Sequence, residues 1–239
     1  MAGLARHSGF SALGDPMYER YFDAVDGILR KVRDANRESI PRAASLMADT
    51  IAADGIVHAF GSGHSQLLAI ELAGRAGGLA AMQVILDPGQ GKAESIEGYA
   101  ATLLRDYQLE SRDCLIVISN SGRNPSPIEM AQLGRQRGLP VIAVTAAEFS
   151  KSVSSRHSSG KRLLDVADVV LDTCGAAGDA AVEIEGVPEA IGPTSTVVGA
   201  TLLNAALVET IGELVRRGVE PPILVSQNVD GSEERNARL

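Results

Sequence analysis

The spacing of apolar residues changes once along the chain. Over residues 17–54, apolar side chains such as Tyr21, Val25 and Ile28 recur at helical spacing, which predicts two helices, the second beginning near Pro41. Beyond this segment, short apolar runs alternate with helical patterns. The runs predict strands at residues 56–60, 82–86, 114–118, 141–145 and 166–172. The helical patterns lie at residues 66–76, 94–104, 125–137 and 194–217.

Strands that alternate with helices favour a parallel sheet with helices on both faces. We therefore expect an α/β fold, a three-layer αβα sandwich with a five-stranded parallel sheet. A single domain is expected over residues 17–239, with residues 17–54 as an N-terminal helical extension. Residues 1–16 are mostly small or polar and are expected to be a flexible terminus. Residues 146–163 and 175–193 are expected to form polar, irregular connections.

Composition and charge narrow the range of partners. Thirty acidic residues against 22 lysines and arginines give a net charge of −8, so no basic stripe is available to displace counterions from a nucleic acid. The apolar segment at residues 197–215 is interrupted by polar and charged residues, which indicates a core helix and no membrane span. Cys114 and Cys174 show neither zinc spacing nor a disulfide framework. The first residues lack the apolar segment of a signal peptide, so we expect a cytoplasmic protein.

The most informative motif lies where the third predicted strand ends. Residues 114–118 run into a hydroxyl-rich turn at residues 119–124, and Pro125 begins a helix at once. The first turn of a helix has unpaired N–H groups and a partial positive charge, so this arrangement predicts a phosphate site. The turn would contribute Ser119, Asn120, Ser121, Gly122 and Asn124. The alternative is that these residues only form a turn and cap the helix.

Two further segments have the same character. Residues 61–65, Gly-Ser-Gly-His-Ser, follow the first predicted strand, although Gln66 stands where a dinucleotide fingerprint would have its third glycine. Residues 194–196 open the long last helix, where capping is the default role and ligand binding is the alternative. Parallel sheets bind ligands at the carboxyl ends of their strands. The binding residues expected from these segments are Ser62, Gly63, Ser65, Thr194, Ser195 and Thr196.

Together these segments resemble the sugar isomerase (SIS) family of phosphosugar-binding domains, over residues 40–219. The Ser-x-Ser-Gly element at residues 119–122 is the most specific part of the resemblance. A closer resemblance, to the uncharacterised UPF0309 group of that family, is carried by residues 61–65, 116–124, 155–162, 192–196 and 220–222. The resemblance implies a flavodoxin-like fold, a phosphorylated sugar as ligand, no cofactor, and a homodimer or homotetramer.

Isomerisation between an aldose and a ketose moves a proton between adjacent carbons and needs an acid and a base. Glu71 lies in a Glu-Leu-Ala-Gly-Arg segment that resembles a heptose-phosphate isomerase motif with a catalytic glutamate; the alternative is an ion pair with Arg75. Glu97 is expected in the first turn of a helix, where the dipole alone would favour it. The related muramic-acid-phosphate etherases have two glutamates in roughly these places. His64 is a candidate acid or positioning donor.

His157 and Lys161 lie in a basic, serine-rich segment after the fourth predicted strand. This segment is a candidate lid or contact to a partner subunit, and a solvated loop is the alternative. The heptose isomerases carry a catalytic histidine in their last helix, but residues 194–218 contain none, so the heptose reaction itself does not carry over. The four histidines are too scattered along the chain to predict a metal site.

The sequence therefore predicts that the protein binds a phosphorylated sugar and isomerises it, with Glu71 as the leading base and Glu97 and His64 as partners. The first alternative is a lyase or etherase acting on an N-acetylated amino-sugar phosphate, because elimination needs the same residue types. The second is a sugar-phosphate sensor without catalysis. Acidic and basic residues offset one another within residues 17–54, which argues against direct DNA binding by this segment.

Overall fold

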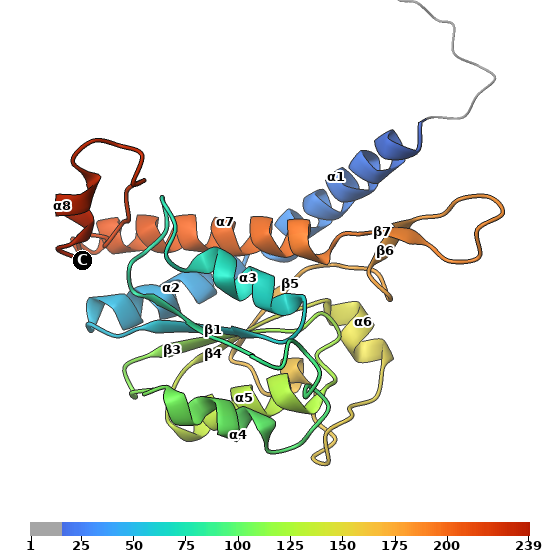
Figure 1. Cartoon of the computed structure of the whole chain (residues 1–239), viewed down its shortest axis with the longest axis horizontal. Helices are drawn as coiled ribbons and strands as arrows, with labels where there is room; N and C mark the ends of the chain where they lie inside the picture. Colours follow the sequence, from blue (N-terminus) through green and yellow to red (C-terminus); the bar gives the residue numbers. More distant parts are fainter. Residues whose placement is uncertain (1–15) are drawn as a thin grey trace, which may run out of the picture.

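Five parallel strands form the central sheet, as the sequence predicts (Figure 1). They are β1 (Val57–Gly61), β2 (Met82–Ile85), β3 (Cys114–Ile118), β4 (Val141–Thr145) and β5 (Val169–Asp172). Their order across the sheet is β2-β1-β3-β4-β5. The chain builds from β1 toward one edge and from β3 toward the other, so the topological switch point lies between β1 and β3. The computed structural model describes residues 16–239, so the flexible terminus expected at residues 1–16 lies, apart from Pro16, outside the described residues.

Neighbouring side chains of each strand enter two separate hydrophobic cores, because they point to opposite faces of the sheet. Ala59, Ile116 and Val144 belong to one core, whereas Phe60 and Val117 belong to the other. The first face is covered by α2 (Ser39–Ala52), α3 (Ser65–Leu72) and α7 (Ser195–Arg216), and the second by α4 (Tyr99–Leu103) and α5 (Pro125–Gln136) (Figure 1). These layers confirm the αβα sandwich and explain why the strands are apolar throughout.

The two predicted N-terminal helices are present. Helix α2 packs into the first core, as does Val32 near the end of α1 (Met17–Ala35). The start of α1 extends away from the sheet toward the ribbon of β6 and β7 (Figure 1). The Tyr21 hydroxyl of α1 donates a hydrogen bond to the Pro193 carbonyl of that ribbon at 2.7 Å. Among the described residues, only α7 is long and apolar enough to cross a membrane. Its buried residues, such as Leu202 and Leu214, pack into the first core, as in the core helix predicted from the sequence.

Several connections are more regular than expected. Residues 175–193 contain an antiparallel ribbon of β6 (Ala180–Val182) and β7 (Ile191–Pro193). Short helices α6 (Ala147–Ser152) and α8 (Ser232–Asn236) lie in polar segments, and 3₁₀ turns occupy Leu104–Asp106 and Leu163–Asp165. The hydrophobic pattern gives little indication of any of them, because few of their side chains are buried.

Helices α3 and α4 are shorter than predicted. Helix α3 ends at Leu72, before the glycine-rich residues 74–78. Helix α4 begins only at Tyr99, because Gly98 before it has a φ of +86°, which a right-handed helix does not allow. The prediction that Glu97 lies in a first helical turn is therefore wrong. Glu97 lies in the turn that precedes α4.

Candidate functional site

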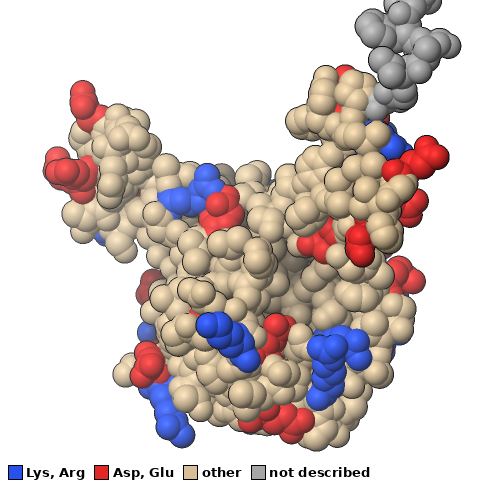
Figure 2. All heavy atoms as spheres, turned by 45° about the vertical axis from the view of Figure 1, so that its right-hand side comes forward, with Lys and Arg blue, Asp and Glu red and all other residues tan. Residues whose placement is uncertain are grey.

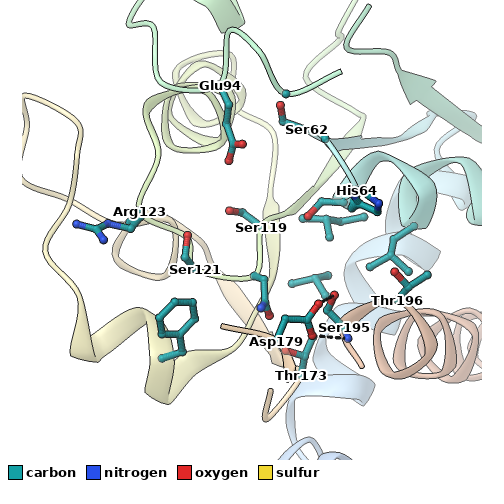
Figure 3. A pocket seen from close by; sticks show the side chains of 18 of the residues that line it. Ser62, His64, Glu94, Ser119, Ser121, Arg123, Thr173, Asp179, Ser195 and Thr196 are labelled. Atoms are coloured by element: carbon teal, nitrogen blue, oxygen red, sulfur yellow. Dashed lines mark hydrogen bonds between the residues drawn. The ribbon is translucent and has the colours of Figure 1, made fainter. Parts of the chain in front are cut away.

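A cleft of about 680 Å³ opens at the carboxyl ends of β1 and β3, where the order of the strands reverses. The side of the molecule turned forward in Figure 2 is hollowed below its two upper projections. The cleft is lined by residues 62–65 after β1, residues 90–92 after β2, residues 119–121 after β3, and the start of α7 (Figure 3). Its volume lies in the range of small-molecule sites, and its place is that of ligands in open parallel sheets.

The structure brings most of the predicted binding residues to this cleft. Those that line it are Ser62, Gly63, His64, Ser65, Ser119, Asn120, Ser121, Ser195 and Thr196. Gly122, Asn124 and Thr194 belong to the same three loops but are not part of the lining. Neither are the predicted catalytic or lid residues Glu71, Glu97, His157 and Lys161.

Asp87 holds the wall formed by the β1 and β2 loops. It is fully buried, and each of its carboxylate oxygens accepts two hydrogen bonds. The donors to Oδ1 are the Gly89 N–H at 2.9 Å and the Tyr99 hydroxyl at 2.7 Å; the donors to Oδ2 are the Ser62 hydroxyl at 2.6 Å and the Gly91 N–H at 2.9 Å. Burial alone would raise the pKa of Asp87, but these hydrogen bonds outweigh it and hold the pKa below its ordinary value. Ser62 is thus bound to a carboxylate on its donor side.

The β3 loop is held by its own backbone. The Ser119 hydroxyl accepts a hydrogen bond from the Gly122 N–H at 3.2 Å. Gly122 has a φ of +59°, and a Cβ there would lie 3.0 Å from the Ser150 hydroxyl oxygen, so only glycine fits. Within residues 16–239, the Ser121 hydroxyl forms no side-chain hydrogen bond, and Asn120 Oδ1 is buried without a partner. This loop therefore has polar groups left over for a ligand.

Asp179 holds the third wall, at the first turn of α7. Its Oδ1 accepts the N–H groups of Thr194 at 3.1 Å and Ser195 at 2.7 Å, and its Oδ2 accepts the Ser195 hydroxyl at 2.6 Å. The carboxylate thus takes the position at the N-terminus of a long helix where anions bind. Asp179 lies just before β6.

Cations outnumber carboxylates around the cleft. The lining includes Lys92, Arg123 and Arg156 against Glu94 and Asp179, and Lys and Arg side chains lie below the hollow in Figure 2. Arg123 donates to the Ser154 carbonyl at 2.9 Å, and Arg156 to Asn124 Oδ1 at 3.1 Å. Lys92 has no ion-pair partner among the described residues. The local charge thus favours an anion in a protein that is acidic overall.

Glu94 is the carboxylate that points into the cleft from the β2 side (Figure 3). Its Oε1 accepts a hydrogen bond from the Asn124 side-chain amide at 2.6 Å. Asn124 therefore lies behind the lining and orients two groups of the rim, Glu94 on one side and Arg156 on the other.

Glu71, by contrast, forms an ion pair with Arg75 and accepts a hydrogen bond from Asn204 of α7 at 3.3 Å. This is the i,i+4 pair that the sequence offered as the alternative, and within this chain it lies outside the cleft lining. The catalytic role of Glu71 stays a prediction.

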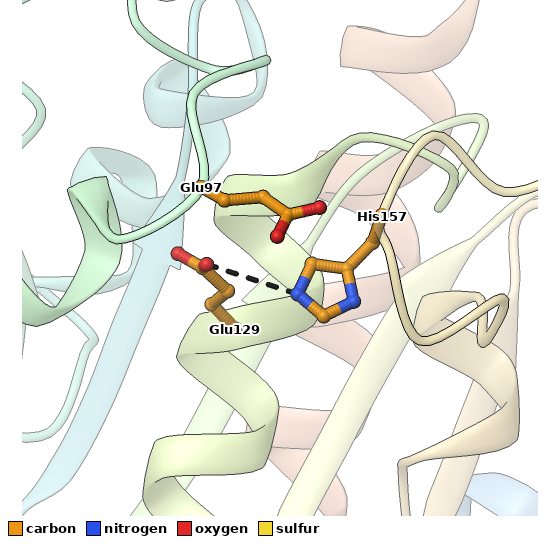
Figure 4. A group of neighbouring side chains, drawn as sticks. All are labelled: Glu97, Glu129 and His157. Atoms are coloured by element: carbon orange, nitrogen blue, oxygen red, sulfur yellow. Dashed lines mark ion pairs between the residues drawn. The ribbon is translucent and has the colours of Figure 1, made fainter.

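Glu97 and His157 come together at a different place, beside Glu129 of α5 (Figure 4). The Ser158 N–H and hydroxyl donate to the Glu97 carboxylate at 2.6 and 2.8 Å, and these bonds lower the pKa of Glu97. Lys161 is exposed on the same loop. The serine-rich segment thus contacts the turn before α4, while its Arg156 reaches the cleft.

Sequence reasoning missed Asp87, Glu94 and Asp179. Asp87 precedes Pro88 and Gly89 and has the pattern of an ordinary turn. Asp179 lies in a segment expected to be irregular. Glu94 lies three residues before Glu97, and the sequence does not show that Glu94 is the one that reaches the cleft. None of the three has a local signal strong enough to identify it.

Comparison with known proteins agrees with this geometry. The SIS domain family matches residues 20–146. A UPF0309 protein of Listeria monocytogenes is 44% identical over 216 residues, which are 90% of this chain and 92% of that protein. A UPF0309 protein of Streptomyces griseus is 42% identical over 231 residues, 92% of each chain.

Solved structures share the fold at lower identity. A phosphoheptose isomerase from Francisella tularensis is 15% identical, with a TM-score of 0.57 over 81% of this chain and 95% of that one. The NanR protein of Vibrio vulnificus, complexed with ManNAc-6P, is 16% identical, with a TM-score of 0.54 over 86% of this chain and 65% of that one. At these identities the likeness shows the fold alone. The extensive match to curated relatives confirms the resemblance found in the sequence, and the chain belongs to the SIS domain family and, within it, to the UPF0309 group.

Proposed function

We propose that the protein binds a phosphorylated sugar in the cleft and isomerises it between aldose and ketose forms. The observation that carries this proposal is the convergence of three hydroxyl-rich loops at the switch point of the sheet, with more cations than carboxylates around them. A phosphate dianion needs several N–H and O–H donors from one direction, and loops of this kind supply them.

The phosphate group fits best at the β3 loop. There the Ser121 hydroxyl has no side-chain hydrogen bond within the described residues, and the Lys92 ammonium lies on the same lining without an ion pair. The Ser195 end of the cleft suits sugar hydroxyls better, because Asp179 already places a negative charge there. A carboxylate accepts hydrogen bonds from hydroxyl groups but repels a phosphate.

Within this chain, Glu94 is the carboxylate best placed to act as the base. Its Oε1 is held by Asn124, so the other oxygen remains to take a proton from the carbon beside the carbonyl and return it to the neighbouring carbon. His64, which lines the cleft from the loop after β1, can move a proton between the carbonyl oxygen and the neighbouring hydroxyl oxygen of the sugar (Figure 3). Glu71 remains a candidate only through a partner subunit.

A homodimer is part of the proposal. Leu67 and Ile70 of α3 and Val197 and Val208 of α7 are 51%, 46%, 40% and 67% exposed, and exposed apolar side chains on neighbouring helices are typical of an interface. Light scattering at micromolar concentration should give twice the mass of the chain. A monomer would contradict this part of the proposal. We also assign the protein to the cytoplasm, where its two free cysteines would stay reduced.

The first experiment is thermal melting of the protein with hexose, heptose, pentose and N-acetylhexosamine 6-phosphates. A ligand at about 100 times its dissociation constant adds about 2.7 kcal/mol of stability, so a real ligand raises the melting temperature clearly. Ser121→Ala should weaken that ligand about tenfold, as expected for one lost hydrogen bond to a charged group. Ser111→Ala, on an exposed turn far from the cleft, is the matched control. No shift with any sugar phosphate or with inorganic phosphate would contradict the proposal.

The second experiment follows the selected sugar phosphate by proton NMR in D₂O. Isomerisation leaves the mass of the substrate unchanged apart from exchange of the transferred hydrogen, whereas elimination releases water or a fragment. Glu94→Gln should abolish turnover while the ligand still binds, and Glu71→Gln tests the base predicted from the sequence. If Glu71→Gln alone is inactive, the base lies in a site shared between subunits. Tight binding without any reaction would favour the sensor, the second alternative from the sequence.

A further inference from the structure

Three side chains from distant segments meet behind the rim of the cleft. Glu97 comes from the turn before α4, Glu129 from α5, and His157 from the loop after α6 (Figure 4). One potential ligand atom of each lies within 4.8 Å of the others. We call these three residues the rim cluster. None of them lines the cleft itself.

One atom of the rim cluster is buried without a hydrogen-bond partner, and a second forms no hydrogen bond within the described residues. Glu129 Oε1 accepts the Gly98 N–H at 2.6 Å, but Glu129 Oε2 is buried and has no hydrogen-bond partner in residues 16–239. The His157 side chain is only 9% exposed, and its Nε2 faces Glu129 Oε1 at 3.7 Å, beyond hydrogen-bond distance. Buried carboxylate oxygens are normally paired, hydrogen-bonded or bound to a metal.

The rim cluster holds two carboxylates, and the His157 imidazole can pair with Glu129 only when it is protonated. Within the described residues, no lysine or arginine forms an ion pair with Glu97 or Glu129. Two carboxylates and a neutral imidazole carry two negative charges, which a divalent cation would balance. Glu97 is already oriented, because the Ser158 N–H and hydroxyl both donate to its carboxylate.

We propose that Glu97, Glu129 and His157 bind a divalent transition-metal ion, Zn²⁺ or Mn²⁺. One imidazole nitrogen with carboxylate oxygens suits these ions, whereas Ca²⁺ and Mg²⁺ prefer oxygen ligands alone. Three protein ligands leave at least one position for water. The expectation of no metal site rested on histidine spacing, and two glutamates from other segments change that picture.

The surroundings of His157 suit a metal ligand. Its Nδ1 lies 2.7 Å from the Ser159 hydroxyl, and an Nδ1–H that donates there leaves the lone pair of Nε2 for the ion. The longer contact of 3.2 Å from the Ser159 N–H to Nδ1 belongs to the other tautomer and is given up when the ion binds.

An ion at this place would join three segments that form the rim of the cleft. Glu94 lies three residues before Glu97, and Arg156 directly precedes His157; both line the cleft, and Asn124 bridges them. The ion would therefore fix the distance between a carboxylate and a guanidinium of the cleft. Metal binding itself does not depend on the proposed sugar-phosphate function, so the two can fail separately.

The test uses the full chain, freed of metal with a chelator and then desalted. Zn²⁺ and Mn²⁺ are titrated in competition with a metal indicator dye. The wild-type protein should bind one ion per chain, and His157→Ala and Glu129→Gln should each weaken binding at least about tenfold. His64→Ala is the matched control, because this histidine lines the cleft and should leave the affinity unchanged. Loss of binding only in His64→Ala would place the ion in the cleft and overturn the proposal.

Equal affinity in all variants, or no binding by the wild type, would also overturn the proposal. If His157→Ala or Glu129→Gln fails to fold by circular dichroism, Glu97→Gln serves instead, because Glu97 is exposed. X-ray absorption of the zinc-loaded wild-type protein provides a second measurement. It should show one imidazole nitrogen among oxygen ligands, and a shell of oxygens alone would contradict the assignment.

Discussion

Asp87 and Asp179 hold opposite walls of the cleft with similar contacts. Each accepts the hydroxyl of a cleft serine at 2.6 Å, from Ser62 or Ser195. Each also accepts two backbone N–H groups, from Gly89 and Gly91 for Asp87 and from Thr194 and Ser195 for Asp179. Their surroundings differ. Asp87 is fully buried beyond the end of β2, whereas Asp179 is half-buried next to the ribbon, outside the central sheet.

The difference indicates two roles for one arrangement. Asp87 is closed off from solvent, so water cannot satisfy the groups that donate to it. Its hydrogen bonds therefore stabilise the fold and hold the β1 and β2 loops together. Asp179 faces a cleft open to solvent, so a ligand oxygen can compete with it for the Ser195 N–H and hydroxyl. Asp87 therefore holds the cleft loops in place, and Asp179 adds a negative charge at one end of the cleft.

Asp87→Asn should have the largest effect. Each oxygen of Asp87 accepts one backbone N–H, so either orientation of an asparagine amide turns its NH₂ group toward the N–H of Gly89 or Gly91. A buried donor left without an acceptor, together with weaker bonds from Ser62 and Tyr99, should lower the free energy of unfolding by about 3 kcal/mol. Urea denaturation measures this. Asp230→Asn, on an exposed turn, should change it by less than about 0.5 kcal/mol. If both variants lower the free energy of unfolding by the same small amount, Asp87 does not have the structural role described above.

The contribution of Asp87 to stability should also appear, with a smaller effect, as a dependence of the melting temperature on acid pH. The hydrogen bonds to Asp87 hold its folded-state pKa below the ordinary value of 3.8. Asp87 therefore stabilises the fold fully above that value, and this contribution is lost as the pH falls through the lower folded-state pKa. Asp113, whose pKa is lowered by hydrogen bonds from Ile56, Glu110 and His58 in spite of its burial, acts in the same direction. Melting temperatures should fall between about pH 4 and pH 2, and less steeply in Asp87→Asn than in the wild type. Identical slopes would show that Asp87 does not stabilise the fold as a carboxylate.

Asp179→Asn should have the smallest effect on stability and a distinct effect on binding. The amide keeps an acceptor for the first turn of α7, so the free energy of unfolding should fall by no more than about 1 kcal/mol. Loss of the negative charge should favour an anion by about 1 kcal/mol, which is about fivefold in affinity. Titration with inorganic phosphate, monitored by calorimetry, tests this at moderate ionic strength. Unchanged or weaker phosphate binding would show that the charge of Asp179 does not repel a phosphate bound at the β3 loop.

The sequence predicts those features that depend on local residue types. Continuous apolar runs predicted all five strands, and the switch from strand to serine-rich turn identified the loops at residues 62–65 and 119–121 that line the cleft. Both signals are local, because burial on two faces and tight turns each select residue types directly.

What the sequence left open depends on long-range contacts. Glu71 is predicted from its resemblance to a heptose-phosphate isomerase motif, but it is held by Arg75 and Asn204. Glu97 is predicted from its place in a helix, but α4 begins later than expected. The serine hydroxyls that Asp87 and Asp179 accept come from other segments of the chain. The rim cluster joins three segments between residues 97 and 157, and no single segment shows its chemistry. Polar pairing between distant loops leaves no periodic trace in a sequence.

Helix α7 limits which parts of the cleft can change when the protein evolves a preference for another ligand. Its 22 residues span about 33 Å, and buried residues such as Val198, Leu202 and Leu214 lock it into the core over that whole length. Any shift of Ser195 and Thr196 must therefore move the entire helix against the sheet. The loops at residues 89–92 and 154–162 carry far fewer buried side chains. In a directed-evolution library, we expect variants that accept larger or smaller substrates to carry their substitutions in these two loops, with α7 almost untouched.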